Sequence, residues 1–343
     1  MPRKLALYAV LLLAIPAPAA RAASEDDDPP ADDAPGEPVL GPTSDRTGDA
    51  AATLADYYPP PVDGPALRLP EPRTRIYIDG SYARSDDLSA LPYIAGKGQN
   101  IRVAAGVAFR WHRFAFDGQL PFNLTIVDVT SVLNQPPMPQ DQHQTRPSLG
   151  DLALGATWTE RLVGDSEGLI AGLGLRGRLA THTTRFTFHL LDGSLAIFTI
   201  PYYFHVEPTV IIGGALGRFT YVINQGAVWL VGPNGYVQDT LVRVPSIYFW
   251  DAHYAIAIAP VSFLGASVEV ATTIQLNHLA GADYQKFNDV RAVWVAPALQ
   301  IHPGAGYRID LIARIGLTRG DELYGVLEYV GTHSFTLRVT RAF

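Results

Sequence analysis

The chain has 343 residues, a formal net charge of −7 and no cysteine, which excludes disulfides and thiolate metal sites. Beyond the first 22 residues, no stretch approaches the roughly 18 consecutive apolar residues that a membrane helix needs. Acids and bases cancel from residue 72 onward without forming a basic patch, so we expect no nucleic-acid partner.

A secretory signal peptide is predicted at residues 1–22. Arg3 and Lys4 precede an apolar run over residues 5–15, and residues 20–22 form an Ala-x-Ala cleavage site. Residues 23–72 follow as a disordered tail in the periplasm. They are rich in Asp, Pro and Ala, and such a composition buries too little apolar surface to offset the entropy of ordering. Docking of this tail to a periplasmic partner is the alternative.

Residues 73–343 show period-two alternation of apolar and polar residues, which predicts β-strands with one apolar and one polar face. The clearest run covers residues 114–126. We expect about twelve strands, within a range of ten to fourteen. They lie near residues 76–82, 101–111, 114–126, 151–158, 169–179, 205–212, 218–224, 250–258, 264–277, 293–301, 307–317 and 335–343.

Short and long connections alternate between these strands, and aromatic residues gather toward the strand ends. An even strand number with short periplasmic turns and long external loops is the pattern of a transmembrane β-barrel. A soluble sandwich has no reason to segregate its loops in this way. The predicted fold is all-β: a closed antiparallel barrel in the outer membrane of a Gram-negative bacterium.

The last strand carries apolar residues at alternate positions, namely Phe335, Leu337, Val339 and Phe343. It resembles the last strand of bacterial outer-membrane barrels, in which a terminal Phe and alternate apolar residues form the assembly signal. The resemblance implies that the barrel-assembly machinery and outer-membrane lipid are partners of the chain.

A second resemblance rests on the run Leu149-Gly150-Asp151-Leu152-Ala153-Leu154-Gly155, which a strand, a short turn and a Gly-rich strand follow. It resembles a hairpin of roughly twelve-stranded outer-membrane proteins assigned as transporters of aromatic-degradation pathways, and of related barrels of unknown function. The chain departs from that family at residues 181–183, where Thr-His-Thr replaces a frequent Pro-Thr-Gly. The resemblance implies a transporter barrel and leaves the solute open.

Inside a bilayer only a closed sheet satisfies the backbone, so the apolar face must meet lipid and the polar face must line the lumen. An Arg on the lipid face would cost roughly 2–4 kcal/mol at the midplane. The ionisable residues in the polar phase are therefore assigned to the lumen: Arg75, Asp79, Arg102, Arg110, Asp117, Asp151, Arg176, Arg178, Glu207, Arg218, Asp251, His253, Glu269, Arg308, Asp310, Arg314 and Arg338.

Two interpretations of this lumen stay open. Paired charges could plug it, or they could line a narrow water-filled passage, because twelve strands lie between barrels filled by side chains and wide channels. Small inward residues such as Gly106, Gly155 and Gly174 favour the passage. We expect a narrow passive channel for small solutes, with Arg and carboxylates setting its selectivity. The alternative is a non-conducting structural or surface-recognition barrel whose external loops bind a partner.

Enzymatic chemistry has little support in the sequence. None of the nine histidines forms a His-x-x-x-His pair or a metal-loop pattern, so no metal or cofactor is expected. Asp251 and His253 lie two residues apart on one strand face, where a carboxylate can orient an imidazole. They give a remote hypothesis of a hydrolase at the rim of the lumen, and we expect no catalytic activity.

Overall fold

The computed structural model describes residues 57–59, 67–69, 73–85, 94–132, 140–163, 168–179, 184–200, 204–231, 234–237, 240–243, 246–277, 291–318 and 333–343. The predicted signal peptide and most of the predicted tail lie outside these residues. No helix among the residues described is long and apolar enough to cross a membrane.

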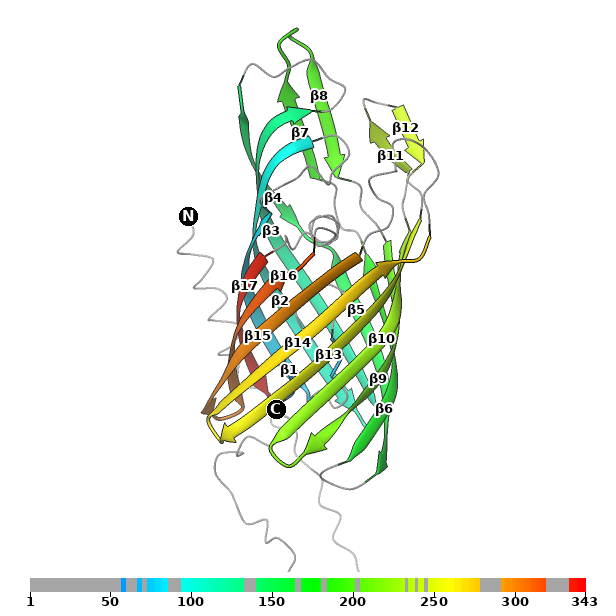
Figure 1. The fold of residues 1–343 in the computed structure, drawn as a ribbon, viewed down its shortest axis with the longest axis vertical. Coiled ribbons are helices and arrows are strands. Elements are labelled where there is room, and N and C mark those ends of the chain that lie inside the picture. Colours follow the sequence, from blue (N-terminus) through cyan, green and yellow to red (C-terminus); the bar gives the residue numbers. More distant parts are fainter. Residues whose placement is uncertain are drawn as a thin grey trace, which may run out of the picture. The chain divides into compact units, whose positions relative to one another are not determined.

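Strands make up nearly all of the described chain (Figure 1). They are β1 (Arg75–Ser85), β2 (Ile94–Trp111), β3 (Phe114–Val132), β4 (Gln142–Leu149), β5 (Leu152–Val163), β6 (Leu169–Leu179), β7 (Thr184–His189), β8 (Leu195–Ile200), β9 (Phe204–Leu216), β10 (Phe219–Val231), β11 (Asn234–Val237), β12 (Thr240–Arg243), β13 (Ile247–Val261), β14 (Leu264–Gln275), β15 (Arg291–Gly304), β16 (Tyr307–Gly316) and β17 (His333–Ala342).

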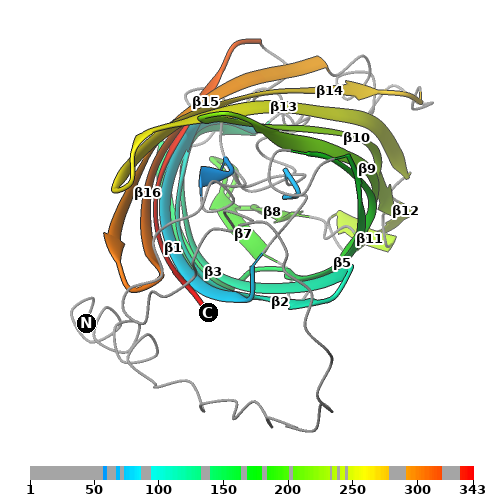
Figure 2. The same cartoon turned by 90° about the horizontal axis from the view of Figure 1, so that it is seen from below.

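The main sheet closes on itself. Its order runs β2-β1-β17-β16-β15-β14-β13-β10-β9-β6-β5-β3, and the pairing of β3 with β2 completes the ring. β4 and β5 both pair with β3, one after the other along its length, so together they act as one strand of the wall. The barrel therefore has twelve strands. All neighbours are antiparallel, so the predicted twelve-stranded barrel is confirmed. Figure 2 shows the ring end-on.

Exposure alternates along each wall strand, as the two faces of the barrel require. On β17, Phe335 and Leu337 on the outer face are 51 % and 44 % exposed, whereas Arg338 is 4 % exposed. On β6, Leu173 and Leu175 are exposed beside the buried Arg176. Apolar side chains therefore cover the outside of the wall, and burying them in lipid is what the hydrophobic effect favours.

Tight turns connect the strands at one end of the barrel. His112 and Gly217 adopt positive φ in the β2–β3 and β9–β10 turns, and Ala305 and Gly306 do so in the β15–β16 turn. Positive φ at both central residues, as at Ala305 and Gly306, is the geometry of a two-residue hairpin whose twist matches the strands. These are connections that the sequence predicts to be short.

Two of the long connections contain strands of their own at the opposite end (Figure 1). β7 and β8 form one hairpin, and β11 and β12 form another. The amide of Gln142 on β4 donates to the carbonyl of His189 at 2.6 Å and accepts from its N–H at 3.0 Å. The side chains of β4 therefore supply hydrogen bonds that hold the β7–β8 hairpin against the wall.

Gly150 and Asp151 interrupt the strand formed by β4 and β5. Pairing with β3 changes register by one residue there, from Gln119 opposite Ala153 to Phe122 opposite Leu149. A Cβ on Gly150 would lie 2.5 Å from the side-chain nitrogen of Asn123, so glycine is required at this bulge. The run that carries the resemblance to transporter barrels thus forms a bulge in the wall.

Candidate functional site

The inward side chains of the wall form three polar clusters. They also contact a piece of the chain that lies inside the ring. The first cluster joins β1, β17 and β16, where Asp79, Arg338 and Asp310 lie side by side in register. Arg338 Nη2 lies 2.7 Å from Asp79 Oδ2, and Arg308 Nε lies 3.0 Å from Asp310 Oδ2. Both carboxylates have no exposed surface, so the guanidinium groups neutralise charges that water does not reach.

The second cluster joins β3, β6 and β9. Arg178 Nε lies 3.2 Å from Glu207 Oε1, and Arg176 Nε lies 3.9 Å from Asp117 Oδ2. Gln119 connects this cluster to the first, because its amide donates to Asp79 at 3.3 Å and accepts from Arg176 Nη2 at 3.4 Å. The charges form a continuous network around part of the lumen.

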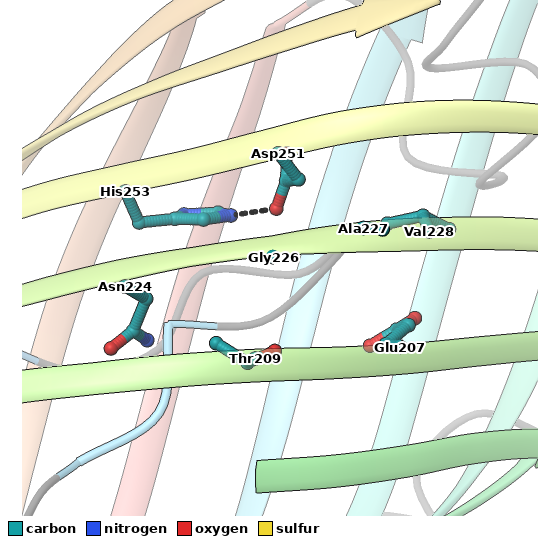
Figure 3. A pocket seen from close by; sticks show the side chains of 8 residues that line it. All are labelled: Glu207, Thr209, Asn224, Gly226, Ala227, Val228, Asp251 and His253. Atoms are coloured by element: carbon teal, nitrogen blue, oxygen red, sulfur yellow. Dashed lines mark hydrogen bonds and ion pairs between the residues drawn. The ribbon is translucent and has the colours of Figure 1, made fainter. Parts of the chain in front are cut away.

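The third cluster centres on His253 of β13 (Figure 3). Its Nε2 lies 2.5 Å from Asp251 Oδ2, and its Nδ1 lies 2.5 Å from Glu269 Oε1 on β14. With both carboxyl groups ionised, each of them accepts a hydrogen bond, so both ring nitrogens donate and the ring is an imidazolium. Thr273 donates to Asp251 Oδ1 at 2.6 Å and not to the imidazole.

This geometry speaks against the hydrolase hypothesis for Asp251 and His253. A general base needs a free ring nitrogen that faces the nucleophile. Both nitrogens of His253 are occupied by carboxylates in a site where its side chain is 4 % exposed. The arrangement cross-links β13 and β14 instead. Among the residues described, no group of three or more His, Cys, Asp or Glu is placed to hold a metal ion.

Two of the residues assigned to the lumen lie at its rim instead. Arg110 is exposed near the end of β2, where its Nε donates to the carbonyl of His112 at 3.2 Å. Arg218 is exposed in the β9–β10 turn. Asp151 is half-buried at the bulge between β4 and β5. The remaining assigned residues lie on the inward face of wall strands, where they are buried or half-buried: Arg75, Asp79, Arg102, Asp117, Arg176, Arg178, Glu207, Asp251, His253, Glu269, Arg308, Asp310, Arg314 and Arg338.

Residues 57–59 and 67–69, here called the inner segment, lie inside the barrel (Figure 2, blue). Tyr57, Tyr58 and Leu67 are at most 3 % exposed. Tyr58, Leu67 and Leu69 pack with Val222 and Ala255 of the wall in one apolar cluster. This part of the predicted tail therefore differs from the expectation of a disordered periplasmic stretch.

Arg68 anchors the inner segment in the polar part of the lumen. Its Nη1 lies 3.2 Å from Asp117 Oδ1 and donates to Thr157 Oγ1 at 3.3 Å. The carbonyl of Arg68 accepts from the amide of Asn224 at 3.3 Å. At the level of the tight turns, the ring of Tyr57 lies 4.1 Å from that of His302, and its hydroxyl donates to the carbonyl of Val261 at 3.1 Å.

Sequence reasoning missed the inner segment and the neutral residues of the network. Tyr57, Tyr58, Leu67 and Leu69 are large aromatic or aliphatic residues within an acidic stretch. That contrast is the signal in the sequence that could have identified them. Gln119 and Trp294 lie in the polar phase of their strands. The guanidinium of Arg314 lies 4.3 Å from the Trp294 ring centre, so this aromatic residue belongs to the lumen and not to the outer surface.

The comparisons with known proteins identify the fold and no family. No family model matches the chain, and no curated protein matches it. An outer-membrane channel from Pseudomonas putida F1 matches with a TM-score of 0.54 and 13 % identity, over 81 % of this chain and 97 % of that one. The translocator domain of autotransporter NalP from Neisseria meningitidis matches with a TM-score of 0.52 and 10 % identity, over 80 % and 89 % of the two chains. The chain has the fold of a bacterial outer-membrane β-barrel.

Proposed function

We propose that the protein is an outer-membrane channel for small polar solutes. The observation that carries this proposal is that wall side chains do not fill the lumen by themselves. Gly174 and Gly265 face inward, and side-chain atoms of Arg68 and Tyr57 occupy the space where their Cβ atoms would be. Barrels of about eight strands are filled by their own side chains, whereas larger ones leave room. A twelve-stranded wall with inward glycines therefore has the capacity for a passage.

The charges of the lumen define what such a passage would favour. Four inward-facing arginines and two inward-facing aspartates lie on β16, β17 and β1: Arg75, Arg308, Arg314, Arg338, Asp79 and Asp310. On β9, β13 and β14, three carboxylates face inward, namely Glu207, Asp251 and Glu269. Opposite signs on different arcs of one wall orient dipolar solutes and discriminate weakly between monovalent ions. We therefore expect passage of small polar solutes with little preference for either sign of charge.

Ion conduction across a planar bilayer tests the proposal. The full chain and a chain lacking residues 57–69 are refolded, inserted and recorded in the same salt, with circular dichroism as the control for the β-fold. We expect discrete conductance steps from the shortened chain and a reversal potential near zero in a salt gradient. Two correctly folded and inserted chains that both stay silent would contradict a channel.

A non-conducting barrel is the second candidate, and one observation favours it. The inward side chains are tightly packed, with no exposed surface on Asp79, Gln300 or Asp310. If this packing is permanent, the barrel serves as a platform for the β7–β8 and β11–β12 hairpins, which would bind a partner. Silence of the shortened chain, together with a retained fold, is the result that selects this alternative.

A further inference from the structure

We propose that the inner segment is a removable gate, which blocks the lumen while Arg68 and Tyr57 are bound to the wall. The inference rests on the proposed channel function and adds its regulation. Three features of the structure support it: the wall has receptor sites for this segment, its polar side chains bind the segment's backbone, and the segment is not part of the sheet.

The receptor sites consist of glycines at the points of contact. A Cβ on Gly265 would lie 2.5 Å from Cδ1 of Tyr57, and one on Gly174 would lie 2.7 Å from Cδ of Arg68. A Cβ on Gly155 would lie 2.9 Å from Nη1 of Arg68 but closer still, at 2.3 Å, to Oδ1 of the wall residue Asp117. Real Cβ atoms do not approach other heavy atoms this closely, so a side chain at Gly265 would force the Tyr57 ring to move, and one at Gly174 would force the Arg68 side chain to move. Gly265 is thus complementary in shape to Tyr57, and Gly174 is complementary to Arg68.

The wall also binds the backbone of the inner segment. Thr220 donates to the carbonyl of Tyr57 at 3.3 Å, and the amide of Gln300 donates to the carbonyl of Tyr58 at 3.2 Å. Asn224 binds the carbonyl of Arg68 in the same way. Thr220, Asn224 and Gln300 are at most 1 % exposed, and buried donors of this kind require partners. The segment supplies acceptors that water would supply in an open lumen.

The attachment is nevertheless weaker than a wall strand. None of the described residues of the inner segment pairs with a strand, since the ring is closed by β2 and β3 without it. Side-chain hydrogen bonds, one ion pair and a small apolar cluster hold it. Wall strands share a ladder with a neighbour on each side, as β1 does with β2 and β17. The segment can therefore leave without opening the barrel.

The gate is tested by comparing variants of the wall and of the segment in the full chain. Gly265→Ala places a methyl group against Tyr57, and Gly80→Ala is its matched control because nothing lies within 4 Å of a Cβ at Gly80. Arg68→Ala removes the anchor without changing the wall, and Arg46→Ala is the control for loss of one positive charge in the same acidic stretch. We expect Gly265→Ala and Arg68→Ala to raise bilayer conductance severalfold, and both controls to match the native chain.

The outcomes separate the gate from the channel. If the chain lacking residues 57–69 conducts no more than the full chain, and both conduct, the gate is overturned and the channel stands. If the shortened chain conducts more than the full chain but Arg68→Ala and Gly265→Ala both conduct like the native protein, the contacts of Arg68 and Tyr57 do not hold the gate closed. That result overturns the proposed gate. If no chain conducts, both proposals fall.

Discussion

Removing Arg338 is expected to destabilise the barrel strongly, because it leaves Asp79 as a buried charge. The two groups lie 2.7 Å apart, with side-chain exposures of 5 % and 0 %. At an effective dielectric constant of about 20 their attraction is of the order of 6 kcal/mol before desolvation is subtracted. Breaking a buried pair on one side costs about 3–5 kcal/mol, whereas replacing both partners by apolar groups is often neutral.

We therefore expect Arg338→Met to lower the free energy of unfolding by about 3–5 kcal/mol, and Asp79→Leu with Arg338→Met to recover most of the loss. Urea-induced unfolding of the protein in lipid vesicles, followed by tryptophan fluorescence, measures both values. A loss below about 1 kcal/mol for Arg338→Met would show that water reaches this pair. A double variant as unstable as the single one would show that the arginine acts through packing and not through charge.

Three further predictions concern the wall. Substituting His253 by Phe leaves Asp251 and Glu269 close together without the shared imidazolium, so we expect a loss of about 3–5 kcal/mol in the same urea assay; a stable variant would mean that the cluster is hydrated. Gly306→Ala should destabilise more than Gly217→Ala, because both have positive φ but only at Gly306 would a Cβ meet a backbone oxygen, at 2.6 Å. Equal losses would refute that reasoning. Leu173→Arg on the outer face should cost about 2–4 kcal/mol in vesicles, and a neutral effect would place that face outside lipid.

The number of strands and the direction of their side chains, toward lipid or lumen, were predictable from the sequence. Apolar and polar residues alternate along a strand with a period of two residues. Once the clear run over residues 114–126 is assigned a lipid face, each charged residue on a wall strand has a defined direction, as Arg176 between Leu173 and Leu179 illustrates. Arg110 and Arg218 share the inward phase but lie where the strands end. The alternation in the sequence shows which face of the wall a side chain is on, but it does not show how close that side chain lies to the end of its strand.

The partners of inward side chains on nearby strands were not predictable. The contacts of His253 with Glu269, and of Gln119 with Asp79, depend on the stagger of neighbouring strands, which the pattern of one strand does not contain. The inner segment was missed for a related reason. Its tyrosines and leucines are too few to form a core of their own, and they become buried only because the closed wall supplies one.

A single engineered disulfide tests most directly whether the inner segment closes a conducting lumen. The chain has no cysteine, so Arg68→Cys combined with Gly174→Cys introduces the only possible pair. The Cβ built at Gly174 lies 2.7 Å from Arg68 Cδ, so the side chains at the two positions are in contact, and mass spectrometry checks that the cross-link forms before the recording. A planar bilayer that is silent with the oxidised protein and shows conductance steps after reductant is added is the expected result. The same conductance before and after reduction, with the cross-link shown to form and break, would contradict a gated channel.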